Sequence, residues 1–263
     1  QGDGIDFVES KPLVLFGHNF ASIAGAGPVI GPIVAMHYFG WAVTLVWILI
    51  GNVFIGAVHD YLALMVSVRN RGSSIADIAE KTMGIRAKSV FSIFLVLAML
   101  LVIAVFGVVA AKTLIAQPQM VVPTFAIIPI SIVLGWFIYY RNADLTVASI
   151  IAVAGVILSI YFGFQFPIEL AENGVIGLSP LMFWFVVLMI YAAVASVLPV
   201  NILLQPRDYL STYILFGSMG LAVLALLWIH PELHTPAYRG GFSEEQGPVW
   251  PMLFVLVACG AVS

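Results

Sequence analysis

The chain has 263 residues, of which 62% are hydrophobic and only 9% are charged. Soluble domains carry about 25% charged residues, and so few charges cannot cover the surface of an ordinary cytosolic enzyme of this size. The 10 Lys and Arg against 13 Asp and Glu exclude a nucleic-acid binder, which needs a basic surface. The high hydrophobic content excludes a disordered tail. The single Cys259 excludes an intrachain disulfide. The composition indicates an all-α, polytopic integral membrane protein.

Eight apolar runs are long enough to cross a membrane as helices. A helical span needs about 20 apolar residues to cross about 30 Å of hydrocarbon, whereas a transmembrane barrel shows alternating segments of about 10 residues. The runs here are long and apolar on all sides, which favours helices. The predicted spans are Leu13–Met36, Trp41–Val68, Val90–Ala116, Val122–Tyr140, Leu145–Gly163, Leu181–Leu198, Tyr213–Ile229, and Pro248 to the end.

The links between the spans predict an orientation. The longest, residues 69–89, is rich in Lys and Arg and is therefore expected in the cytoplasm. Within it, Ser74 and Asp77 resemble a capping box, and Gly84 would end the short helix. We expect this helix on the inner membrane surface; a solvated connector is the alternative. Residues 230–247, rich in Pro and Gly, predict an irregular outer loop.

Neither end of the chain resembles a natural terminus. It begins with Gln1 rather than Met, and it stops at Ser263 within an apolar run. We therefore expect residues 1–263 to form a single transmembrane core within a longer protein.

The first span contains a cluster of glycine and proline, in the string GHNFASIAGAGPVIGP of residues 17–32. Proline removes a helical hydrogen bond and glycine permits non-helical backbone, so the helix should break within the membrane. Unwound backbone is tolerated there only where protein buries it or where it lines a cavity, and freed N–H groups attract a carboxylate. The alternative is a kinked helix whose small residues allow close packing. The candidate substrate-binding residues are His18, Asn19, Gly25, Ala26, Gly27, Pro28 and Gly31.

The second span carries a polar stripe. Asn52, Gly56, His59, Asp60, Ala63 and Ser67 recur at helical spacing and share one face. An intramembrane carboxylate usually faces an interior cavity, so Asp60 is a candidate proton or ion carrier that His59 would tune. The alternative is that Asp60 lies near the cytoplasmic end and pairs structurally with a cation.

A second break follows the sixth span, at residues 198–201 (LPVN). Pro206 suits the first turn of a new helix, and Asp208 suits its positive N-terminal end. Arg207 can bind a carboxylate through two hydrogen bonds, unless it only anchors an inner loop together with Asp208. Asn52, Asn201, Arg207 and Asp208 are therefore candidate gate or substrate contacts.

The two breaks fall in spans one and six, which alternation orients in opposite directions. Corresponding interruptions in two oppositely oriented halves indicate an inverted-repeat transporter, with the substrate between the broken helices.

Other classes of function find less support. Walker A, HExxH, CxxC and GxSxG motifs are absent from the sequence, so we predict no enzyme activity, no cofactor and no metal. A redox subunit that holds haem between histidines remains an alternative, although His18, His37 and His59 lie at different predicted depths. A channel is another, but rings of like polar residues are not visible.

Four blocks of the sequence resemble the carbon starvation protein A family of bacterial inner-membrane transporters. They are GHNFASIAGAGPVIGP, GAVHDYLALMVSVRNRGSSIADIAEKTMG, LPVNILLQPRDYLSTY and GPVWPMLFVLVACGAVS, in this order along the chain. Members often carry two histidines where this chain has His18 and Asn19, so Asn19 is not assigned the proton chemistry of histidine. The resemblance implies that family members extend beyond this chain at both ends. It also implies that the fold contains the inverted five-helix repeat of the amino acid–polyamine–organocation transporters.

The resemblance also implies a function. Family members import peptides during carbon starvation, and related members import pyruvate with protons. We therefore expect an inner-membrane secondary transporter that imports short peptides or pyruvate, with a proton, or alternatively sodium, as coupling ion. Its partners would be this substrate and the lipid bilayer, without nucleic acid; the oligomeric state is not predicted. In this interpretation Gly25–Gly31 hold the substrate carboxylate, His18 and Asn19 line the pocket, and Asp60 with His59 carries the proton.

Overall fold

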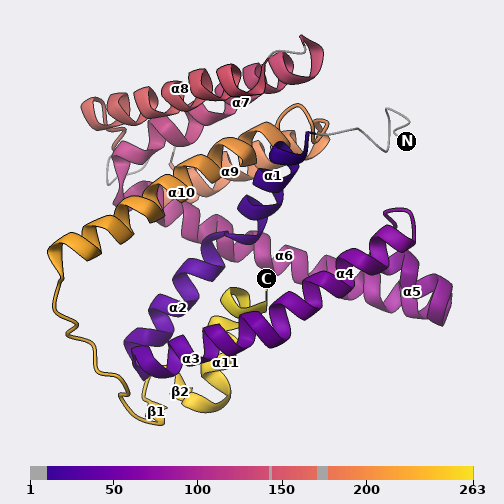
Figure 1. Ribbon diagram of the computed structural model, residues 1–263, viewed down its shortest axis with the longest axis vertical. Coiled ribbons are helices and arrows are strands. Elements are labelled where there is room, and N and C mark those ends of the chain that lie inside the picture. Colours follow the sequence, from indigo (N-terminus) through magenta and orange to yellow (C-terminus); the bar gives the residue numbers. More distant parts are fainter. Residues whose placement is uncertain (1–10, 142–143, 171–176, 263) are drawn as a thin grey trace. The chain divides into compact units, whose positions relative to one another are not determined.

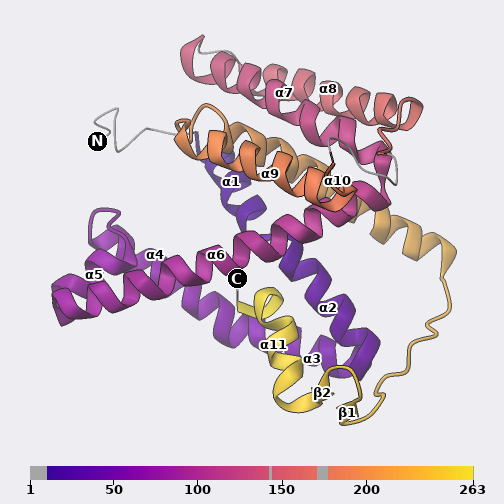
Figure 2. The same ribbon diagram turned by 180° about the vertical axis from the view of Figure 1, so that it is seen from behind.

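The structure is a computed structural model that describes residues 11–141, 144–170 and 177–262. Helices dominate it, with one pair of short strands (Figures 1 and 2). Within the described residues, seven segments are long and apolar enough to span a membrane, which confirms the prediction of an all-α, multi-pass membrane protein. The elements are α1 (Pro12–Ile23), α2 (Ala26–Phe39), α3 (Trp41–Gly51), the π-helical turn η1 (Asn52–Gly56), α4 (Ala57–Arg69), α5 (Ile75–Met83), α6 (Ile85–Ala116), the 3₁₀ turn η2 (Pro118–Met120), α7 (Val121–Tyr140), α8 (Leu145–Gln165), α9 (Pro180–Val197), α10 (Leu204–Ile229), β1 (Phe242–Ser243), β2 (Gly247–Pro248) and α11 (Val249–Val262).

The chain forms two compact units. Unit 1 holds the described residues up to Ser22 and Ile103–Ile229, and unit 2 holds Ile23–Val102 and the residues from His230 onward. In unit 1, α7 and α8 lie side by side (Figures 1 and 2). Its main apolar core joins α1, α7, α8 and α10 through Val14, Leu134, Ile138, Ala152, Val156, Tyr209 and Leu210. In unit 2, α2 packs on α11 through Ala35, Phe39, Leu253 and Val257.

Most predicted spans match helices to within a few residues, with two corrections. The seventh begins at Leu204 rather than Tyr213. The polar residues at its start lower the local hydropathy, yet Pro206 lies in the first turn, where a missing N–H breaks no helical bond. The eighth, expected from Pro248 to the end, is helical as α11 but has only 14 residues, so it is not among the seven segments of spanning length in the described part of the chain.

Close packing of α2 on α11 depends on Gly31. A Cβ atom at this position would lie 2.2 Å from the carbonyl oxygen of Leu256, so only a residue without a side chain allows the two backbones to approach this far. Small residues play this part between membrane helices, where close backbone contact supplies packing energy.

We expect Gly31→Ala to destabilise unit 2, because the added methyl group would meet backbone rather than a flexible side chain. Overpacking of this kind costs about 1–3 kcal/mol. Thermal unfolding of the purified full-length protein measures the effect. Gly220→Ala in α10 is the matched control, since nothing lies within 4 Å of the added Cβ there. Equal melting temperatures for the two variants would contradict the prediction.

The link at residues 69–89 contains the predicted capped helix, α5. The Ser74 hydroxyl donates to an Asp77 carboxylate oxygen at 2.8 Å and accepts from the Asp77 backbone N–H at 3.3 Å. Gly84 ends the helix with a φ of +91°, a conformation that favours glycine. On α6, Lys88 reaches Asp77 at 2.9 Å and Glu80 at 2.6 Å. The location of α5 on the membrane surface stays a prediction.

The cap of α5 should weaken in acid. The hydrogen bond from Lys88, followed by that from Ser74, lowers the pKa of Asp77 below the ordinary aspartate value. A depressed pKa means that this carboxylate stabilises the fold at neutral pH, and that its contribution is lost as the pH falls through the lowered pKa. We expect the amides of Ile75–Met83 to exchange hydrogen faster in acid, after correction for intrinsic rates. Ser74→Ala should reduce this pH dependence; an unchanged dependence would contradict the assignment.

The loop at residues 230–247 is more regular than predicted, because β1 and β2 form a small antiparallel hairpin. Its location on the outer side of the membrane stays a prediction. Gly247, with a φ of +82°, closes a three-residue connection of the kind that suits a hairpin. Upstream, the loop is bonded to the corner between α2 and α3, which we call the α2–α3 corner (residues 39–42). The bonds are Trp41 N to Pro236 O, Ala42 N to Ala237 O and Arg239 N to Phe39 O, at 3.0–3.3 Å. The Tyr38 hydroxyl also donates to the Glu245 carboxylate.

Candidate functional site

The first span is broken, as predicted, but over fewer residues. α1 ends at Ile23 and α2 begins at Ala26, and the N–H of Gly25 turns back to the carbonyl of Ile23 at 2.9 Å. The expected unwinding over Gly25–Gly31 is therefore wrong in extent, because the backbone is helical again from Ala26 through Phe39.

The position of the prolines explains why the helix resumes so early. Pro28 is the third residue of α2, where a backbone N–H would have no helical partner anyway. Gly31 is helical and packs on α11, as described above. Pro32 lies inside the helix, where it removes one hydrogen bond without ending it.

The residues predicted around this break differ in exposure. His18 is partly buried and Asn19 is exposed, while Gly25, Gly27 and Pro28 are half-buried. The N–H groups of Ala26 and Gly27 lie in the first turn of α2, which carries no side-chain cap and no acidic residue. Such amides lack helical partners and favour an anion.

The second break lies between α9, which ends at Val197, and α10, which begins at Leu204. Pro206 is in the first turn of α10, as predicted. Asn201 is half-buried in the link, while Arg207 and Asp208 lie within the first turns of α10.

In unit 1, His18 of α1, which precedes the first break, contacts Asp208 of the Arg207–Asp208 pair, which follows the second break. His18 Nδ1 lies 2.8 Å from Asp208 Oδ2, and the side chains are 27% and 14% exposed. Arg207 donates from Nη2 to the other oxygen of Asp208 at 3.0 Å, and from Nη1 to the Tyr191 hydroxyl of α9 at 2.7 Å. We call these four residues the His18–Asp208 cluster. Three of them were predicted separately, and their contact was not.

α1 lies close against α10 next to this cluster, with Gly17 at the contact (Figure 1). A Cβ at Gly17 would lie 3.0 Å from the Tyr209 ring and 3.2 Å from the Tyr209 Cα. The Thr212 hydroxyl donates to the Gly17 carbonyl at 2.7 Å, and the Tyr209 hydroxyl lies 2.9 Å from that of Ser149 on α8. Sequence analysis did not single out Gly17, Tyr191, Tyr209 and Thr212 as candidate site residues. The sequence feature that could have indicated Tyr209 is its spacing of four residues from Tyr213, which places both hydroxyls on one helix face; in the structure they lie 2.8 Å apart.

The polar stripe of the second span is interrupted by the π-helical turn η1. Ala57 N donates to Asn52 O across this turn, which offsets Asn52 from the face below it; Asn52 is exposed and Gly56 is buried. His59 Nδ1 and Asp60 Oδ1 are 3.3 Å apart, with side chains 63% and 46% exposed. The predicted pair therefore forms, on an exposed part of the described chain.

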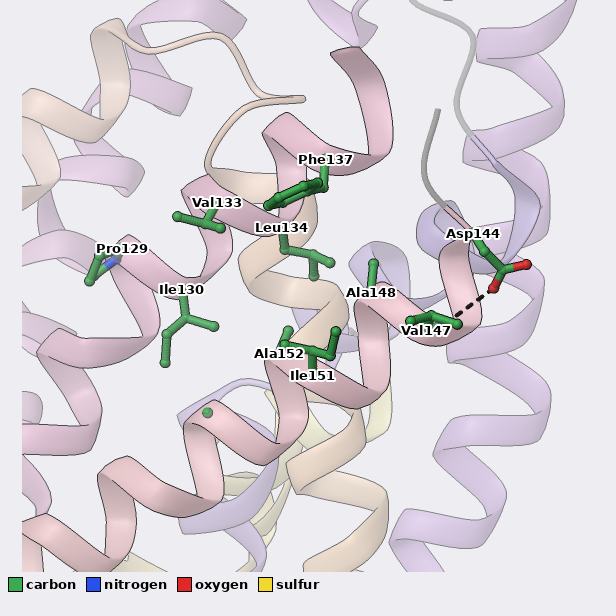
Figure 3. A pocket seen from close by; sticks show the side chains of 11 residues that line it. Pro129, Ile130, Val133, Leu134, Phe137, Asp144, Val147, Ala148, Ile151 and Ala152 are labelled. Carbon is green, nitrogen blue, oxygen red and sulfur yellow. Dashed lines mark hydrogen bonds between the residues drawn. The ribbon is translucent and has the colours of Figure 1, made fainter. Parts of the chain in front are cut away.

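A groove of about 640 Å³ lies between α7 and α8, and its lining is almost entirely apolar (Figure 3). The exception is Asp144, whose carboxylate accepts hydrogen bonds from the N–H groups of Thr146 and Val147 and so caps α8. Because the carboxylate repels anions and the other side chains offer no donors, this groove does not suit a carboxylate-bearing substrate.

Comparison with known proteins gives a consistent set of relatives. A family model described as carbon starvation protein CstA matches residues 1–263. The chain is 37% identical to the Peptide transporter CstA of Campylobacter jejuni over 100% of this chain and 38% of that protein. It is 36% identical to the Peptide transporter CstA of Escherichia coli, with 100% and 38% covered.

A relative with a different printed activity is the Pyruvate/proton symporter BtsT of Escherichia coli, which is 33% identical over 100% of this chain and 37% of that protein. The chain thus spans less than half the length of these curated relatives. No solved structure is significantly similar to it.

Proposed function

Because the chain belongs to the carbon starvation protein CstA family over residues 1–263, we propose that the protein is a secondary transporter of the bacterial inner membrane, without enzyme activity. It imports a small carboxylate-bearing nutrient, a short peptide or pyruvate, together with a proton. The observation that carries the proposal is whole-chain similarity both to proteins named as peptide transporters and to one named as a pyruvate/proton symporter.

The two helix breaks support this proposal. Secondary transporters bind substrates near the midplane beside discontinuous helices, often through the amides at the start of a half-helix. In our proposal, the N–H groups of Ala26 and Gly27 hold the substrate carboxylate, with His18 and Asn19 as further contacts. The inverted repeat remains part of the proposal, supported by the interruptions after Ile23 and Val197.

The proposal assigns a role in proton movement to the His59–Asp60 pair. Intramembrane ionisable residues commonly mark proton relays. Since both side chains are more exposed than those of the His18–Asp208 cluster, we assign them to proton entry or release.

Uptake by membrane vesicles tests the function. Full-length protein in vesicles with an alkaline interior, without sodium, is offered labelled pyruvate or labelled alanyl-alanine in parallel. We expect one compound to accumulate above its external concentration, and a protonophore to abolish the accumulation. Vesicles without the protein are the control. Equilibration without accumulation would indicate a channel, and no uptake of either compound would overturn the proposal.

A further inference from the structure

The His18–Asp208 contact joins two helices that both adjoin a break. His18 lies near the end of α1, and Asp208 lies near the start of α10. Both oxygens of Asp208 are engaged, Oδ2 by His18 and Oδ1 by Arg207. With 14% of its side chain exposed, this carboxylate depends on protein donors rather than on water, as buried charges require.

The surroundings determine how this cluster can respond to a proton. The charged and titratable groups that face the pair are Arg207 on α10 and Tyr191 on α9, which bond to each other. Tyr209 packs on Gly17, and its hydroxyl is bonded to those of Ser149 and Tyr213. Arginine is charged at all relevant pH values, so Arg207 is a fixed cation beside Asp208.

The net charge of the cluster therefore depends on the protonation of His18. With a neutral imidazole, Arg207 and Asp208 cancel and the cluster carries no net charge. The neutral ring donates its Nδ1–H to Asp208, which leaves Nε2 to accept a proton from water. Imidazole is the side chain that most readily changes charge near neutral pH. Protonation at Nε2 gives an imidazolium and leaves the cluster with one uncompensated positive charge.

We infer that the His18–Asp208 cluster is the proton-binding site whose occupancy is linked to binding of the substrate carboxylate. This inference rests on the proposed function. The anionic carboxylate compensates the positive charge that His18 gains, so each ligand favours the other. Linkage is reciprocal: if the proton strengthens carboxylate binding, the carboxylate strengthens proton binding by the same factor. Arg207 and Tyr191 are positioning residues that hold Asp208 in place to accept from His18.

Binding measurements on the purified full-length protein test this inference. The probe is pyruvate or alanyl-alanine, whichever accumulates in the vesicle assay, titrated calorimetrically in two buffers of different ionisation enthalpy. Wild type should take up protons on binding, and its Kd should rise by up to about tenfold per pH unit above the midpoint. His18→Asn keeps an N–H donor for Asp208 but cannot take the proton, so its Kd should be independent of pH. His37→Asn, an exposed histidine of α2, should behave as wild type.

A second variant covers the case in which His18→Asn fails to bind or fold. Arg207→Gln removes the fixed cation, so His18 should protonate more readily and the midpoint of the Kd dependence should move to higher pH. Proton uptake that persists in His18→Asn, or an unchanged midpoint in Arg207→Gln, would overturn the inference. Because accumulation by wild type is established first, either result would leave the proposed function standing, whereas absence of accumulation would remove the function itself.

Discussion

Replacement of Gly17 by leucine is expected to force α1 away from α10 and to abolish substrate accumulation. The new side chain would begin 3.0 Å from the Tyr209 ring and 3.2 Å from its Cα, and the Cα cannot move without displacing α10. Overpacking costs about 1–3 kcal/mol, and the displacement would also break the contact between His18 and Asp208. Thermal unfolding and vesicle uptake by the full-length protein measure the two effects.

Gly217→Leu is the matched control for this change. Gly217 lies on α10, and nothing is within 4 Å of a Cβ placed there, so its leucine variant should unfold near the wild-type temperature and accumulate substrate. Wild-type stability and accumulation in Gly17→Leu would show that α1 and α10 do not need their close contact.

Asp60→Asn is expected to abolish uphill uptake while exchange of labelled for unlabelled substrate continues. Asparagine has nearly the shape of aspartate but cannot bind or release a proton, so a group assigned to proton entry or release would no longer function. Exchange needs no net proton movement and should survive. Parallel measurements of accumulation under a pH gradient and of exchange without one separate these two activities.

The control for Asp60→Asn is the same substitution at Asp144. Asp144 caps α8 through the N–H groups of Thr146 and Val147, and asparagine serves as an N-cap about as well as aspartate. Asp144→Asn should therefore keep both activities. Accumulation that persists in Asp60→Asn would exclude Asp60 from the proton path.

Local sequence predicted the helices and breaks well, because these depend on hydropathy and on the backbone chemistry of Gly and Pro. The length of the first break was overestimated. Pro28 and Gly31 signal disruption when counted by type, but their effect depends on position: Pro28 lies in a first turn, and Gly31 provides a close contact with α11. Only the three-dimensional structure shows that these two residues serve a helix start and a helix contact rather than an unwound segment.

The cluster itself could not be predicted, because 190 residues separate His18 from Asp208. Each was singled out locally, His18 for its place before a break and Asp208 for its place at a helix start. Their contact follows from the approach of α1 to α10 over Gly17. Small residues in the first span suggested close packing, but the sequence did not indicate which helix would be the partner. The same limit hid Tyr191, which shares a largely apolar helix with only one other hydroxyl-bearing residue, Ser196.

Hydrogen bonds join the loop at residues 230–247 to the α2–α3 corner, so the hairpin is attached to unit 2 at several points. Backbone bonds from Pro236, Ala237 and Arg239 reach this corner, and the hairpin adds a side-chain contact between Glu245 and Tyr38. A fluorophore attached to β1 or β2 would therefore follow the end of α2 rather than drift as a loose tether. Such a label turns residues 230–247 into a reporter for movement of α2, the second half of the broken helix.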